Sequence, residues 1–237
     1  MSIKEKQIQV LDLTIDVVKK DINNMHLAVY PPTGRIRIAT PKDLNDEAIR
    51  LFAISKIRWI KKHQKNFYEQ LRETSREYID GESHYFDGKR YLLRVIERYG
   101  KHELKIKNKS YLELYVSPKA TIEAKEKVFN EWYRDHLKEI VPNIIKNWEE
   151  KTNLNCENWN IKKMRTKWGS CNIEKRKIML NLELAKKPRH CLEYVIVHEL
   201  MHFLERNHND NFKGLLDKFM PNWKTYKREL NDLLVAY

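Results

Sequence analysis

The chain has 237 residues, with 46 Lys and Arg against 33 Asp and Glu, which gives a net charge of +13 at pH 7. This length predicts one or two domains that bury their own cores without covalent staples. The 3 cysteines make no disulfide framework, which fits a reducing compartment. No stretch resembles a signal peptide or a membrane span, so the sequence predicts a cytoplasmic protein without membrane attachment.

The first 40 residues show the two-residue period of β-strands. Apolar and polar residues alternate over 3–18, 27–30 and 35–38. The Pro-Pro-Thr-Gly segment at 31–34 has the residue types of a turn between the last two strands. We therefore expect an antiparallel meander.

A basic helix is predicted over residues 47–72, where apolar residues recur at helical spacing and Asn45 can cap the first turn. Its outer face is rich in Lys and Arg, with Trp59 among them. Such a face can contact nucleic acid, and it can equally be a solvated surface whose long side chains cover apolar neighbours. The excess of positive charge leaves both interpretations open.

A second alternating stretch spans 83–116, with Asp87 and Gly88 as a predicted hairpin turn. The period then changes from two to 3.6 residues near residue 117. The sequence thus predicts an α+β fold, with an antiparallel β-rich domain over 1–117. A mainly helical domain with a small sheet is expected over 118–237.

The second half begins with a helical pattern over 120–151, in which Pro142 predicts a kink or a second helix start. Two short strands are expected near 159–171 and 177–182. Pro188 then opens a helix at its first position, where the missing N–H group costs nothing.

That last helix carries a His-Glu-x-x-His motif. His198 and His202 are four residues apart, which places both imidazoles on one helix face, and Glu199 points to nearly the same side. The flanking residues are apolar, so the helix is predicted to be buried, where polar side chains need a partner. The motif also arises by chance in histidine-rich chains, but the buried setting and a third histidine, His208, favour a metal site.

Three imidazoles around one cation suit zinc best and leave a position for water. We therefore predict Zn²⁺ bound by His198, His202 and His208. Glu199 is the predicted general base for the metal-activated water, and the predicted reaction is hydrolysis of a peptide bond. Cys171 has two interpretations. It can be a thiolate ligand of the zinc, but a small buried thiol is more common.

Histidines at 198, 202 and 208 also have the spacing of the metzincin group. Here Glu205 stands where that group has glycine, so the turn after the helix is expected to differ.

A closer resemblance is to the YgjP-like metallopeptidase family, which is related to SprT-type and WLM-type metallopeptidases. It rests on the segment Arg165–Cys171, with the sequence RTKWGSC, and on the motif from His198 to Phe212 followed by Pro221. The resemblance implies a zincin-like catalytic domain in which the three histidines bind zinc and Glu199 is catalytic.

It also implies that a strand with Trp168, Gly169 and Ser170 lies beside the cleft and binds an extended substrate. For Trp168, plain core packing is the alternative. Sequence proximity makes Arg165, Lys167 and Tyr194 candidates for oxyanion stabilisation.

Two functions follow from the sequence. The first is a zinc-dependent metallopeptidase acting on a peptide or protein. The alternative is a nucleic-acid-associated protein with a zinc site, which either acts on DNA-bound proteins or binds DNA without proteolysis.

Overall fold

A computed structural model of the chain describes residues 5–30, 33–69, 76–164 and 166–232. The chain forms two compact units, Met1–Arg72 and Glu73–Ala236. Each unit has its own cluster of buried apolar residues. The fold is α+β, as predicted.

The first unit is a four-stranded sheet with strand order β1-β2-β4-β3. Its elements are β1 (Glu5–Val10), β2 (Leu13–Lys20), β3 (His26–Tyr30), β4 (Arg35–Pro41), α1 (Asp46–Ser55) and α2 (Ile57–Glu69). Buried isoleucines of β2 and β4, such as Ile15 and Ile36, pack in one core with Ile49 of α1 and Ile60 of α2. Asn45 caps α1 as predicted, because its side chain accepts a hydrogen bond from the Ala48 N–H.

The expectation of an antiparallel meander in this unit is wrong in one pairing. β2 and β4 run parallel, with Ile15 opposite Ile36 and Val17 opposite Ile38. The chain leaves β2, forms the edge strand β3 and returns by a hairpin, so β4 enters the sheet between them. Alternation in the sequence identifies the buried face of a strand, whereas the identity of its neighbour depends on long-range packing.

The predicted basic helix is two helices. α1 ends before Lys56, whose N–H bonds to the Ala53 carbonyl in a tighter turn, and α2 starts at Ile57. On α2, Lys61 pairs with Asp12 at 2.9 Å. Contact with nucleic acid through this face stays a prediction.

The second unit begins with another four-stranded sheet, with strand order β5-β6-β8-β7 and a parallel β6–β8 pair. It is followed by the long helix α3, and these elements are β5 (Ser83–Phe86), β6 (Lys89–Glu97), β7 (Glu103–Lys107), β8 (Tyr111–Val116) and α3 (Ile122–Thr152). Asp87 and Gly88 both have positive φ, at 47° and 75°, as the predicted hairpin turn requires.

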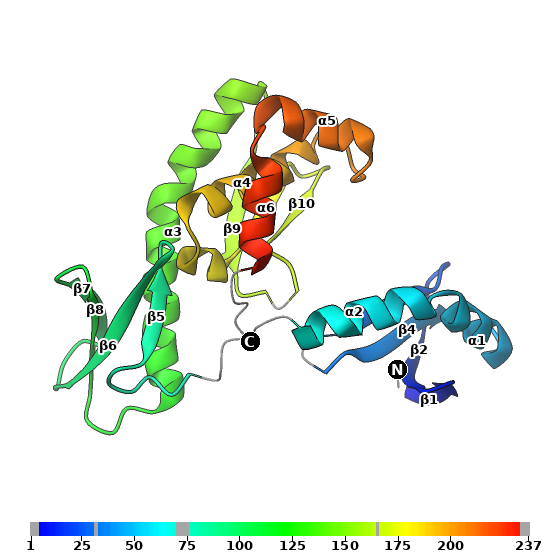
Figure 1. The fold of residues 1–237 in the computed structure, drawn as a ribbon, viewed down its shortest axis with the longest axis horizontal. Helices are drawn as coiled ribbons and strands as arrows, with labels where there is room; N and C mark the ends of the chain where they lie inside the picture. The colour runs from blue at the N-terminus through cyan, green and yellow to red at the C-terminus, as the bar shows by residue number, and fades with distance from the viewer. Residues whose placement is uncertain (1–4, 31–32, 70–75, 165, 233–237) are drawn as a thin grey trace. The chain divides into compact units, whose positions relative to one another are not determined.

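The boundary expected near residue 117 therefore differs from the division in the structure. Leu93 of β6 and Leu112 of β8 belong to the same buried cluster as Phe129 and Leu137 of α3. The change of sequence period marks the passage from sheet to helix inside one core. Figure 1 shows α3 extending from this sheet to the elements that follow.

The rest of the second unit packs on the other part of α3 (Figure 1). Its elements are β9 (Asn158–Lys162), β10 (Gly169–Asn172), β11 (Lys177–Asn181), the 3-10 turn η1 (Leu182–Lys186), α4 (Arg189–Met201), α5 (Asp210–Phe219) and α6 (Trp223–Asp232). β11 is the central strand, parallel to β9 and antiparallel to β10, which leaves β10 at an edge.

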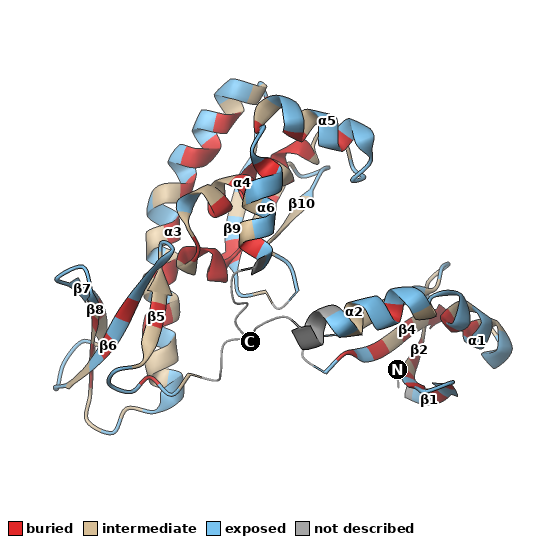
Figure 2. Ribbon diagram, in the orientation of Figure 1, coloured by how far each residue is buried: buried red, intermediate tan, exposed pale blue. Residues whose placement is uncertain are grey.

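Helix α3 continues through Pro142 as one element, so the second helix start that the sequence allowed at this proline does not occur. Buried and exposed bands alternate along it in Figure 2, as expected for a helix with one face on the core. Within the described residues, no helix combines the length and the apolarity needed to cross a membrane.

Candidate metal centre

Helix α4 places two of the predicted ligands. Most of its residues are buried, so its orientation in the core is fixed by apolar contacts on several sides. The buried apolar residues of this helix include Cys191, Leu192, Val195, Ile196, Val197, Leu200 and Met201. His198 and His202 lie one turn apart on the remaining side, as the spacing predicts.

The third histidine reaches the first two because α4 stops early. The helix ends at Met201, and the Leu204 and Glu205 N–H groups both bond to the Met201 carbonyl, which turns the chain back. An asparagine can end a helix in the left-handed conformation, but Asn207 is not among the residues with positive φ, because the turn is made earlier.

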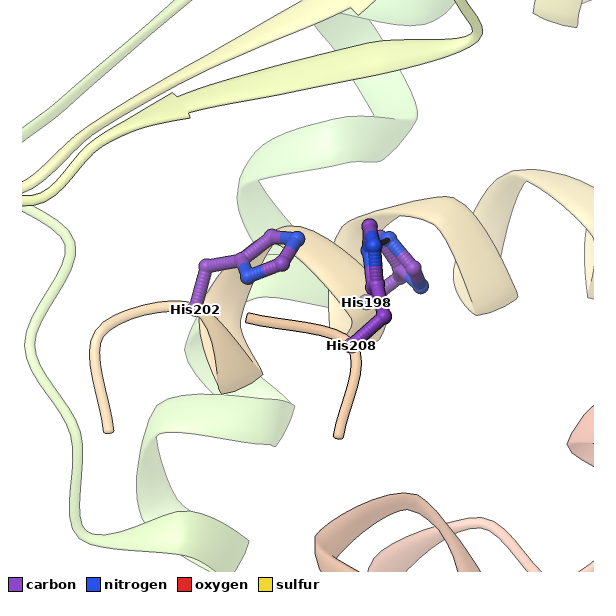
Figure 3. Close-up of side chains that lie close together, drawn as sticks. All are labelled: His198, His202 and His208. Carbon is purple, nitrogen blue, oxygen red and sulfur yellow. Dashed lines mark hydrogen bonds between the residues drawn. The ribbon is translucent and has the colours of Figure 1, made fainter. Parts of the chain in front are cut away.

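Three imidazoles converge at this point. One ligand atom from each of His198, His202 and His208 lies within 4.8 Å of the others, and the Nε2 atoms of His198 and His208 are 3.0 Å apart. Figure 3 shows His198 on α4, His202 at the end of that helix and His208 on the segment after it. The buried Phe212 packs beneath all three, with its ring centre 5.0, 4.6 and 4.9 Å from theirs.

The electrostatics of the cluster favour neutral imidazoles. Burial, followed by the neighbouring His202 and His208, lowers the pKa of His198 to about 3. Burial also lowers the pKa of His208. A neutral imidazole has a free lone pair, which is the form that binds a cation.

Other features of the cluster test whether a metal fits. A tetrahedral zinc with N ligands at about 2.0–2.1 Å separates those nitrogens by roughly 3.3 Å, close to the distance between His198 and His208. Nδ1 of His202 lies 3.0 Å from the Glu205 carbonyl, a contact that orients the ring and leaves Nε2 as the ligand. The residues present therefore fit a zinc ion.

The acidic residues that follow the metal helix in the sequence, Glu205, Asp210 and Asp217, are candidates for hydrogen bonds to the histidines. Glu205 provides one through its main chain, which no residue-type pattern could indicate. Asp210 instead pairs with Lys213, and Asp217 accepts a hydrogen bond from the Trp223 indole.

Glu199 is buried beside this cluster, but it does not belong to the group of candidate metal ligands. Burial raises the pKa of its carboxyl to about 8, while the charge of Lys167 acts in the opposite direction. The carboxylate packs against Gly169 of β10. A Cβ atom at residue 169 would lie 2.6 Å from Oε1 and 2.9 Å from Cγ of Glu199, so only glycine leaves this space free.

Trp168, Gly169 and Ser170 line the same cleft as the histidines and Glu199, in a cavity of about 820 Å³. Trp168 also packs partly against the main core, and contact of this residue with a substrate stays a prediction. Cys171 lines the cleft too, but it lies outside the three-histidine group, and burial raises the pKa of its thiol to about 12.

Asn181 is a positioning residue that sequence reasoning missed. It is buried, and its side chain accepts from the Met164 N–H and donates to the Met164 and Lys167 carbonyls. Its own N–H donates to the Trp168 carbonyl. These bonds hold the loop before β10 against the sheet, and no local signal marks an asparagine at a strand end for such a role.

Of the oxyanion candidates, Lys167 and Tyr194 line the cleft, whereas Arg165 lies outside the described residues. Burial raises the pKa of the Tyr194 phenol to about 12, which keeps it a hydrogen-bond donor at neutral pH.

Comparison with known families decides the class of the protein. A family model described as the YgjP-like metallopeptidase domain matches residues 24–233. The chain belongs to the YgjP-like metallopeptidase family. The resemblance inferred from the sequence is thereby confirmed, and the class implies a hydrolase acting on a peptide or protein substrate.

Two solved structures are also similar over part of the chain. Abylysin, a metallopeptidase zymogen of Pyrococcus abyssi, is 14% identical with a TM-score of 0.36, over 38% of this chain and 91% of that chain. Jannalysin, a metallopeptidase zymogen of Methanocaldococcus jannaschii, is 24% identical with a TM-score of 0.34, over 38% and 92% respectively. The comparison with curated proteins gives no match.

Proposed function

We propose that this YgjP-like protein is a zinc-dependent peptidase in which His198, His202 and His208 hold the ion and Glu199 is the general base. The observation that carries the proposal is the convergence of three imidazole ligand atoms within 4.8 Å, in a cleft that also contains a buried carboxylate. Catalytic zinc sites use three protein ligands and keep one position open.

Each residue then has a separate task. A zinc ion held by the three histidines would supply Lewis acidity and would lower the pKa of a bound water. Glu199 would accept the proton of the attacking water and later donate it to the leaving amine. Phe212 would fix the orientation of the imidazole rings, and the Tyr194 hydroxyl is the proposed hydrogen-bond donor to the developing oxyanion, because Tyr194 lines the cleft.

The substrate is proposed to lie along β10. This strand is at the edge of its sheet, so its outer main-chain groups are available for an extended peptide. Trp168 and Ser170 are the proposed side-chain contacts with that peptide. Gly169 serves both parts of the site, because it exposes the main chain on one side and makes room for Glu199 on the other.

The decisive experiment measures zinc content and cleavage of a peptide library for the parent, Glu199→Gln and His198→Ala. The parent should bind about one zinc per chain and cleave peptides. Glu199→Gln should keep the zinc and lose at least about 100-fold in kcat, because the proton acceptor is gone. A metal-free parent, or a His198→Ala protein as active as the parent, contradicts the proposal.

A second experiment tests the space beside Glu199. Gly169→Ala should keep the zinc but lower kcat by about 100-fold, because the new methyl group displaces the carboxylate by a fraction of an ångström or more. Gly214→Ala is the matched control, since a Cβ at residue 214 has no neighbour within 4 Å. Equal losses in the two variants would show that the contact with Glu199 has no catalytic importance.

A further inference from the structure

Helix α6 contributes part of the lining of the cleft. Lys227, Leu230 and Asn231 all line the cleft, as residues spaced by three and four positions on one helix face do. The helix is anchored by Leu230, which is 2% exposed, and by Trp223, whose indole donates to Asp217 at 2.7 Å. The Lys227 backbone is therefore held in place beside the three histidines.

Positive charge predominates in this cleft. Lys167, Arg206 and Lys227 line it, and the acidic residues that line it are Glu174 and the catalytic Glu199. An extended substrate in the cleft thus meets cations on more than one side.

Two cations that line the cleft, Arg206 and Lys227, lack carboxylate partners in the part of the chain that the structure describes. Among the described residues, neither Arg206 nor Lys227 has a carboxylate oxygen within 4.0 Å of its charged nitrogens. Lysines nearby on the outer surface do have partners, since Lys213 pairs with Asp210 at 2.8 Å and Lys224 pairs with Asp217 at 3.3 Å.

The Lys227 ammonium group lies over the Trp223 ring, 5.7 Å from its centre, but within the described residues it has no carboxylate partner to offset its charge beside the candidate metal site. Lys227 lines the same cleft as His198 and His208. The same charge repels any cation held by these rings. An arrangement that weakens the metal site is explained if an anionic part of the substrate occupies the space next to Lys227.

We propose that Lys227 and Arg206 form a subsite for a carboxylate of the peptide substrate, so that the enzyme selects peptides with a carboxylate next to the scissile bond. This inference rests on the proposed peptidase function. Two sources share the chemistry: the side chain of Asp or Glu inside the peptide, and the free carboxylate at its C-terminus. Lysine and arginine bind such groups through charge-assisted hydrogen bonds.

The test uses the full-length zinc protein and matched fluorogenic peptides. One pair replaces Glu by Gln near the cleaved bond, and a second pair compares a free C-terminus with an amidated one. We expect a preference of about tenfold in kcat/KM for the carboxylate member of one pair, which falls as salt rises. The pair that shows it identifies the source of the carboxylate.

The variants assign the preference to the subsite. Lys227→Gln and Arg206→Gln should each reduce severalfold the ratio of kcat/KM for the carboxylate peptide to kcat/KM for its neutral partner. Lys227→Glu should reverse the preference in favour of a peptide with Lys at that position. Lys224→Gln is the control, because Lys224 lies on the same helix, pairs with Asp217 and does not line the cleft.

The outcomes separate this inference from the proposed function. A parent that cleaves both members of each pair equally overturns the subsite and leaves the peptidase intact. If no peptide is cleaved, calorimetric binding of the same peptides to Glu199→Gln decides the matter. Binding that favours carboxylate peptides and needs Lys227 supports the subsite without catalysis, and equal binding overturns it.

Discussion

The two four-stranded sheets of this protein have the same topology and different surroundings. In each sheet, the first two strands form a hairpin and the third strand lies at an edge. The fourth strand enters between the second and the third, so β2–β4 and β6–β8 are the parallel pairs. The first sheet completes its core with α1 and α2. The second shares its core with α3 and with α4, the helix that leads into the candidate metal site. Similar strand patterns therefore have different consequences for the active site.

The largest expected effect comes from separating the second sheet from the metal helix. A chain of residues 118–237 removes Leu93, Leu112 and Leu114, all at most 1% exposed, from the core that contains Phe129 and Leu137. We expect it to fail to fold, because each buried leucine contributes about 2 kcal/mol or more. A chain of residues 73–237 should keep a cooperative unfolding transition and bind zinc.

The measurement is thermal unfolding followed by circular dichroism, with zinc content determined after gel filtration. A folded, zinc-binding 118–237 fragment would support the boundary expected from the sequence period. Failure of both fragments would show that the first unit contributes stability that the separate cores do not reveal.

A single truncation in each sheet sharpens the comparison. Ile36 of β4 and Leu112 of β8 occupy corresponding positions in the two parallel pairs and are 2% and 0% exposed. Changing either to Ala should cost its own unit about 2–5 kcal/mol. Only Leu112→Ala should lower the temperature at which zinc is released, as measured with a chromogenic chelator during heating.

Zinc release that shifts equally in Ile36→Ala and Leu112→Ala would contradict the independence of the two cores. The exposed Leu51→Ala in α1 is a suitable control, because its side chain is 59% exposed and its loss should change little.

The pH dependence of stability should also differ between the units when zinc is absent. His198 has a folded pKa of about 3, below its ordinary value of 6.5, so its contribution to stability falls as pH drops from 6.5 toward 3. Glu199 has a folded pKa of about 8, above its ordinary 4.5, so its contribution falls as pH rises from 4.5 toward 8. The two slopes oppose each other between 4.5 and 6.5.

The second unit should therefore be most stable near pH 4.5–6.5 and lose stability on both sides. In the first unit, hydrogen bonds from Gln7 and Arg35 lower the pKa of Asp16 below 3.8. The first unit should therefore begin to lose stability only at more acidic pH. Urea unfolding from pH 3 to 8 measures both. Glu199→Gln should remove the alkaline loss of the second unit, and an unchanged loss would refute the assignment.

The sequence predicted the α+β class, most strands, the cap at Asn45, and the residues of the candidate site. These features depend on local patterns, such as two imidazoles four residues apart on a helix. The parallel strand pairs and the division between units could not be predicted, because they depend on contacts between distant segments. The same holds for Asn181 and Lys227, whose roles come from the loop and the cleft that folding brings to them.

The smallest effect compares two helix caps. Asn45 caps α1 by accepting from the Ala48 N–H at 2.9 Å, and Asn209 caps α5 by accepting from the Phe212 N–H at 3.0 Å. Replacing either by Ala should cost its helix about 1 kcal/mol. Asn209, however, follows His208 directly and fixes the helix that carries Phe212 beneath the imidazoles.

Asn209→Ala should therefore raise the zinc dissociation constant by about tenfold, as loss of outer support of a ligand does, while Asn45→Ala leaves it unchanged. Competition with a chelator of known affinity measures both at one pH. The two variants lose similar helix stability, so a difference in zinc affinity isolates the position of His208 from general destabilisation. Equal zinc affinities would mean that the turn from Met201 to His208 holds the third imidazole without its cap.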